Sequence, residues 1–129
     1  MNIKLYKTLL TGAIFSTFTA CATTPTASNG PTVLEQHKNI SAEPSTKHNL
    51  ARLIKQTDNC VIEFTGNFET GKATEHWIFK GDQLISAFSN VDAEVEKKQT
   101  VFDIQDVAKL KNFDSLKKNF KATNLEKCH

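Results

Sequence analysis

The sequence predicts a small α+β domain in which an antiparallel meander of three or four strands is flanked by an N-terminal and a C-terminal helix. Stretches rich in β-forming residues are separated by two turn-like segments, 69–72 and 81–82, about ten residues apart. Apolar residues at helical spacing precede and follow these stretches. When helices cover one face of a sheet, the apolar residues of the helices and those of the strands are buried against each other. We therefore expect a single domain over residues 46–129.

The predicted N-terminal helix begins at Ser45 or Thr46, either of which can cap it, and runs to about residue 57. Three apolar residues fall on one of its faces: Leu50, Leu53 and Ile54. Residues 21–45, which precede the helix, are rich in Thr, Pro, Ser and Asn near their start and show little apolar periodicity. Such a composition buries too little surface to fold, so we expect a flexible tether there.

Three strands are expected after this helix. Residues 60–68 alternate along a strand, residues 73–80 form the returning strand, and residues 84–89 form the third. Residues 91–99 are very polar and fit either an exposed fourth strand or a mobile loop. Residues 100–104 are again strand-like in composition.

Near the C-terminus, Asp106 can cap a turn, and Asn112 or Asp114 can cap the second helix. A core-facing stripe follows at helical spacing: Phe113, Leu116 and Phe120. We expect the hydrophobic core to draw on the following residues: Phe64, Trp77 or Ile78, Phe79, Leu84, Phe88, Phe102, Leu116 and Phe120.

The start of the chain has the layout of an export signal. Lys4 and Lys7 form a short basic start, residues 8–20 are mostly apolar or small, and Cys21 directly follows Ala20. The apolar run is shorter than the roughly 20 residues that a membrane-spanning helix needs. This pattern resembles a bacterial lipoprotein signal peptide, which implies removal of residues 1–20 and a diacylglycerol on Cys21. A plain secretory signal with a chance cysteine is the alternative.

The resemblance also implies a location. Two or more acyl chains hold a protein stably on a membrane. In lipoproteins of enteric bacteria, an Asp directly after the lipidated cysteine resembles an inner-membrane retention signal. This chain has Ala22 at that position, so we expect the protein to lie on the periplasmic face of the outer membrane.

With Cys21 lipidated, Cys60 and Cys128 remain as a pair. Export brings them into an oxidising compartment, where disulfides persist, so we expect one disulfide that closes the domain. The alternative is a metal site formed by Cys60, Cys128 and His129, but it lacks the closely spaced ligand pairs typical of zinc.

The charge balance argues against nucleic acid as a partner. The whole chain has a formal net charge of +2, and removal of residues 1–20 leaves 14 basic residues against 14 acidic ones. Binding to phosphates needs clustered and uncompensated Lys and Arg.

We find no catalytic motif, no cofactor motif and no pair of histidines at metal-binding spacing. The candidate binding face is centred on Trp77, which is either a core residue or, together with Phe79, an anchor for a partner. Glu75 and His76 precede it, and in a strand Glu75 and Trp77 share a side that His76 does not.

These observations predict a non-enzymatic lipoprotein, bound to the membrane through Cys21, that binds an envelope protein or glycan through its sheet or a sheet edge. An inhibitor, an immunity-type protein or an assembly accessory would fit. The alternatives are an envelope hydrolase that acts on peptidoglycan or glycan, and a purely structural lipoprotein. The oligomeric state stays open.

Overall fold

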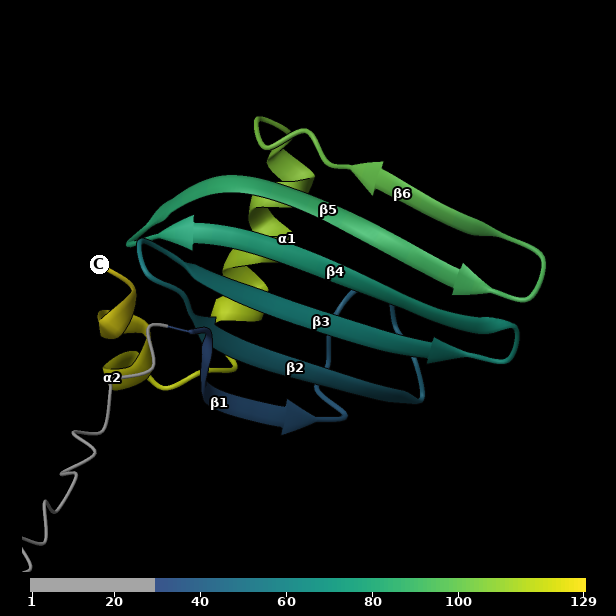
Figure 1. The fold of residues 1–129 in the computed structure, drawn as a ribbon, viewed down its shortest axis with the longest axis horizontal. Helices are drawn as coiled ribbons and strands as arrows, with labels where there is room; N and C mark the ends of the chain where they lie inside the picture. Colours follow the sequence, from purple (N-terminus) through teal and green to yellow (C-terminus); the bar gives the residue numbers. More distant parts are fainter. Residues whose placement is uncertain (1–29) are drawn as a thin grey trace, which may run out of the picture.

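A computed structural model describes residues 30–129, which form a six-stranded antiparallel sheet with short helices packed on one face (Figure 1). The strands follow one another across the sheet in chain order: β1 Thr32–Lys38, β2 His48–Lys55, β3 Cys60–Phe68, β4 Gly71–Lys80, β5 Gln83–Ala93 and β6 Lys97–Val101. The helix α1, Val107–Lys117, is followed by α2, Ala122–Leu125, and by a 3-10 turn, η1, Glu126–Cys128.

The hydrophobic core lies between the sheet and the helices. Phe113 of α1 is the residue that joins the two layers: its ring centroid lies 6.1 Å from that of Trp77 and 5.2 Å from that of Phe79. All three side chains are almost fully buried. The other predicted core residues that are buried on this face are Phe64, Leu84, Leu116 and Phe120. The core is therefore built by alternate residues of the central strands and by one stripe of the C-terminal segment.

The start of α1 is fixed by Asp106, whose side chain accepts hydrogen bonds from the backbone N–H groups of Ala108 and Lys109 at 2.8 and 3.3 Å. An acceptor at this position satisfies two of the free donors of a helix start. The predicted cap is thus real, but it opens the whole helix rather than a single turn. The helix begins before Asn112 and Asp114, which were the predicted caps.

The predicted fold class is wrong in its count of strands and in its N-terminal helix. The stretch expected to be that helix is β2, which pairs with β3 over its whole length. Its apolar residues occupy both faces of the sheet, because Ala51 and Leu53 are buried beneath the helices while Leu50 and Ile54 lie on the other side. A strand with apolar residues on both faces imitates helical spacing, and pairing with a neighbour decides between the two.

Two further strands extend the sheet at its edges. β1 lies inside the stretch that the sequence assigned to the tether and pairs with β2. At the other edge, β5 continues to Ala93 and turns into β6. The polar residues 91–99 therefore belong mostly to a hairpin whose side chains are largely exposed, which is why β6 has no strong apolar pattern.

Glu35 of β1 joins this edge strand to the C-terminal segment. Its carboxylate accepts hydrogen bonds from the backbone N–H of Lys121 at 3.0 Å and from Asn124 Nδ2 at 2.9 Å, and the Nε2 of His37 lies 2.7 Å from its other oxygen. Burial alone raises the pKa of Glu35, but these hydrogen bonds outweigh it and hold the pKa below its ordinary value. The carboxylate is ionised at neutral pH and binds the start of α2.

The predicted disulfide is confirmed. Cys60 at the start of β3 and Cys128 in η1 are bonded, with an S–S distance of 2.05 Å, and both are fully buried. The bond fastens the end of the chain to the middle of the sheet. The predicted signal peptide, residues 1–20, and the lipidation site, Cys21, lie outside the described residues. Within residues 30–129, none of the helices has the length and apolar content required to cross a membrane.

Candidate binding interface

The face of the sheet that points away from the helices, here called the open face, carries a row of side chains aligned by strand pairing. Arg52 pairs with Glu63, Glu63 with His76, and His76 with Phe88, so one residue from each of β2 to β5 lies side by side. We call these four residues the central row. The pairing continues to Val101 of β6, which is 76% exposed.

The charges of the central row compensate each other. Arg52 Nε donates to Glu63 Oε1 at 3.1 Å, and its Nη2 donates to the same oxygen. His76 Nδ1 lies 3.8 Å from Glu63 Oε2, and the imidazole stacks on the Phe88 ring with centroids 4.7 Å apart. The side chains of Arg52, Glu63 and His76 are 35%, 20% and 22% exposed, so this is a half-buried ion pair beside a stacked ring.

Burial lowers the pKa of His76 below its ordinary value, because a charged imidazole loses hydration there. Glu63 acts in the opposite direction, and Arg52 adds to the lowering. At neutral pH the imidazole is therefore neutral, and the central row carries one positive and one negative charge.

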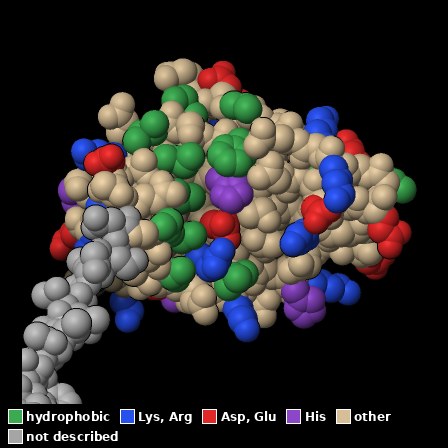
Figure 2. All heavy atoms as spheres, in the orientation of Figure 1, with side chains coloured by type: hydrophobic (Ala, Val, Ile, Leu, Met, Phe, Trp, Pro, Cys, Tyr) green, Lys and Arg blue, Asp and Glu red, His purple; other side chains and the backbone are tan. Residues whose placement is uncertain are grey.

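Hydrophobic side chains lie directly beside the central row. Ile54 pairs with Val61, and Val61 pairs with Ile78. Ile78 pairs with Ser86, next to a register shift in which Ile85 is the extra residue of β5 and is 46% exposed. We call Ile54, Val61, Ile78 and Ile85 the apolar row. Figure 2 shows hydrophobic side chains running down this face beside a histidine, an acid and a base in its middle.

The four residues of the predicted binding face lie on two sides of the sheet. Trp77, Phe79 and Glu75 are buried under the helices, where the Trp77 indole N–H donates to Glu75 Oε2 at 3.0 Å. Only His76 lies on the open face. Of the two roles left open for Trp77, the structure shows the core residue, and the adjacent residue His76 is the one near the surface.

Sequence reasoning missed most of the open face. Arg52 fell within the predicted N-terminal helix, so nothing linked it to Glu63. The alternation of 60–65 separated Val61 and Glu63 from the core side, and this was the available signal. The alternation within one strand does not show which strands pair with it, so it could not predict that Arg52 and His76 flank Glu63.

No protein-family model, curated protein or solved structure matches this chain. The chemistry of the described surface therefore carries the functional argument.

The sheet separates one pair of acids that the strands bring close in sequence register. Glu63 and Glu75, the acids of two adjacent strands, point to opposite faces of the sheet and cannot converge on one substrate. In residues 30–129 there is also no group of three or more His, Cys, Asp or Glu side chains arranged to hold a metal ion.

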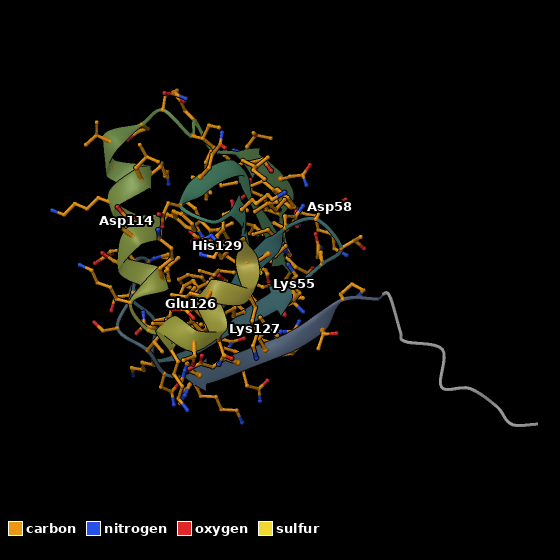
Figure 3. All side chains as sticks on the ribbon, turned by 90° about the vertical axis from the view of Figure 1, so that its left-hand side faces the viewer. Lys55, Asp58, Asp114, Glu126, Lys127 and His129 are labelled. Atoms are coloured by element: carbon orange, nitrogen blue, oxygen red, sulfur yellow. A yellow bond between two sulfur atoms is a disulfide. The ribbon has the colours of Figure 1, made fainter. Side chains whose placement is uncertain are left out.

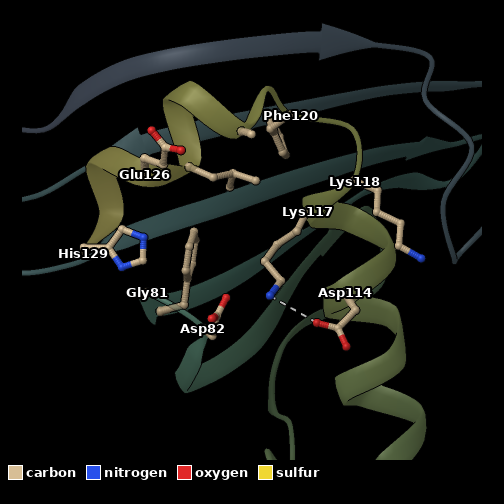
Figure 4. Close-up of a pocket in the computed structure, with 11 residues that line it drawn as sticks. Gly81, Asp82, Asp114, Lys117, Lys118, Phe120, Glu126 and His129 are labelled. Carbon is tan, nitrogen blue, oxygen red and sulfur yellow. Dashed lines mark ion pairs between the residues drawn. The ribbon is translucent and has the colours of Figure 1, made fainter.

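A pocket of about 530 Å³ lies at the end of the sheet between α1, the C-terminal segment and the turn from β4 to β5 (Figure 4). Phe79 and Phe120 contribute to its lining, and the ion pair of Lys117 and Asp114, 3.2 Å apart, lies at one wall. Figure 3 shows the same end of the molecule, where both acidic and basic side chains are found: Lys55, Asp58, Asp114, Glu126, Lys127 and His129. The mixed charges give this pocket no preference for an anion or a cation.

The buried Glu75 predicts a pH dependence of stability. Burial raises the pKa of Glu75, while the Trp77 hydrogen bond and Lys109 act against it. A group with a raised pKa in the folded state stabilises the fold at low pH and loses this contribution as the pH rises through that pKa. Glu75→Gln removes the ionisation and keeps an oxygen for Trp77. We expect this variant to melt at a higher temperature than the wild type at pH 7 and at the same temperature near pH 4.

Thermal unfolding between pH 4 and pH 8 measures this difference. Glu69→Gln is the matched control, because Glu69 is exposed in the turn between β3 and β4. A Glu75→Gln variant less stable than wild type at pH 7 would contradict the prediction.

Proposed function

We propose that this chain is a lipoprotein of the bacterial outer membrane that faces the periplasm and acts by binding a protein partner, without catalysis. The open face is its binding surface. The observation that carries the proposal is the apolar row beside a central row whose charges neutralise each other. Such a surface offers a partner the exposed Ile85 beside the half-buried Ile54 and Ile78, and it has little net charge.

The composition of this face favours a protein partner. The centres of protein interfaces are depleted in charged residues and enriched in aromatic and apolar ones. The charged groups of the central row are already paired, so their burial under a partner leaves no charge without a counter-ion. A glycan needs unsatisfied hydrogen-bonding groups that converge, whereas one side of the central row is apolar and the hydroxyls of Thr65 and Thr74 on its other side already bond each other at 3.2 Å.

Acylation of Cys21 would keep the domain close to the membrane. The chain takes nine residue steps from Cys21 to Gly30, the first described residue, and can span at most about 30 Å over them. β1 begins at the end of the sheet that holds the C-terminus and the turn from β2 to β3 (Figure 1). With the anchor in place, this end lies nearest the membrane and the open face stands beside it.

The test combines fractionation with site-specific cross-linking in the native envelope. A photo-reactive amino acid is placed at Ile78 in the full-length chain, and the same residue at Val95, which is 94% exposed in the turn between β5 and β6, is the control. We expect a discrete protein adduct from position 78, none from position 95, and both chains in the outer-membrane fraction. Cys21→Ser should move the chain out of the membrane fraction.

Two results would contradict the proposal. A Cys21→Ser chain that stays in the membrane fraction would remove the lipid anchor. The absence of a protein adduct from position 78 would remove the open face as the binding surface.

A further inference from the structure

We infer that the partner on the open face is a second copy of this chain, related to the first by a two-fold axis that runs parallel to the strands between β3 and β4. The inference rests on the proposed function and names the partner of the same surface. It follows from the pattern of the face, which complements itself under this one operation.

A rotation of this kind places β2 over β5 of the second copy and β3 over its β4, while each residue keeps its position along the strands. Arg52 then faces Phe88 of the second copy, and Glu63 faces His76 of the second copy. A guanidinium over an aromatic face is attracted by the ring, and a carboxylate beside an imidazole is compatible in either protonation state. The central row thus meets its own image without opposing like charges.

The apolar row is also matched to itself. Val61 faces Ile78 of the second copy, and Ile54 faces Ile85 and Ser86 of the second copy. Apolar contacts therefore form a row that crosses the axis beside the central row and includes all four central strands. Side chains of two sheets interdigitate in this way when sheets stack about 10 Å apart.

The place where the described chain begins supports this axis over others. A two-fold axis parallel to the strands leaves both copies of β1 starting at the same end of the pair. Two short tethers then reach one membrane. A two-fold axis across the strands would put the tethers at opposite ends, more than a strand length apart. Two tethers so far apart fit poorly with anchoring to one membrane surface.

The available area is close to what a stable pair needs. Six strands about 4.8 Å apart and about eight residues long present a face of roughly 29 by 26 Å. This amounts to roughly 750 Å², and each partner in a standard interface buries about 800 Å².

The experiment uses two full-length copies with different affinity tags, produced in the same cells, with the photo-reactive residue at Ile78. We expect an adduct of twice the chain mass that contains both tags. Ile85→Glu in both copies should lower its yield at least tenfold, because the acid then faces Ile54 of the second copy. Val95→Asp, an equally large change of polarity at an exposed site, should leave the yield unchanged.

A charge exchange guards against loss of folding. When one copy carries Ile54→Lys and the other Ile85→Glu, the two new charges face each other once and the two-tag adduct should return. Formation of the Cys60–Cys128 bond in each variant reports that the domain has folded. An adduct from position 78 that contains a different protein would overturn the inference and leave the proposed function intact. Absence of any adduct would overturn both the inference and the proposed function. A two-tag adduct whose yield Ile85→Glu does not reduce would overturn the inference alone.

Discussion

Replacing Cys60 and Cys128 together with alanine should lower the free energy of unfolding by roughly 4 kcal/mol. The disulfide closes a loop with a sequence separation of 68 residues. In the chain-entropy model, a cross-link over a loop of this length restricts the unfolded chain by about that amount. A domain of about 100 residues has a total stability of roughly 5–15 kcal/mol, so the loss is a large fraction of it.

The loss should also be concentrated at the end of the chain. Cys128 lies in η1, and the backbone carbonyl of Cys128 accepts a hydrogen bond from the N–H of Gly81 at 2.7 Å. Without the covalent link, α2 and η1 are held mainly by Glu35, Phe120 and Leu125. We expect amide protons of residues 119–128 to exchange faster than those of β3 and β4 in the double variant.

Urea unfolding of the oxidised wild type and of the double alanine variant measures the difference. Alanine is the appropriate replacement because both sulfurs are fully buried and a serine hydroxyl would lack a partner there. A loss below about 1 kcal/mol would contradict the entropic argument.

Phe113→Ala should destabilise the domain by about 3–5 kcal/mol, the range observed when a fully buried aromatic side chain is truncated. Phe113 is 2% exposed and lies against the rings of Trp77 and Phe79, so its removal leaves a cavity between the two layers. The fluorescence of Trp77, the single tryptophan of the chain, should shift toward that of a hydrated indole as water enters.

The matched control is Phe88→Ala on the open face. Phe88 stacks on His76, is only partly buried, and has no helix above it among residues 30–129. Its truncation should cost no more than about half as much, because the free energy scales with the area removed from water. Equal losses in the two variants would show that α1 contributes little to holding the layers together.

The sequence predicted the centre of this fold better than its edges. β3, β4 and the turn between them follow from alternation and turn residues that are local in the chain. β1 and β2 could not be recognised in the same way. β1 is an edge strand whose polar residues pair only with β2, and β2 has apolar residues on both faces, so each is defined by pairing with an adjacent strand and not by its own sequence pattern.

The candidate site shows the same limit. Alternation correctly separates His76 from Glu75 and Trp77, since neighbours in a strand point to opposite faces. Which of the two faces becomes the core is decided by Phe113, more than thirty residues later in the chain. The sequence pattern of β4 alone left Trp77 and Ile78 as alternatives for the core.

The contact between Glu35 and the C-terminal segment has a mechanical consequence. With the proposed anchor at Cys21, a pull from the membrane would enter the described part of the protein through β1, its first strand. Glu35 passes part of this force to Lys121 and Asn124, and the covalent link from Cys128 to Cys60 carries it into the third strand of the sheet. Under the proposed anchoring, tension would be shared between hydrogen bonds at the edge and one covalent bond at the centre, so the outermost strand would not bear the load alone.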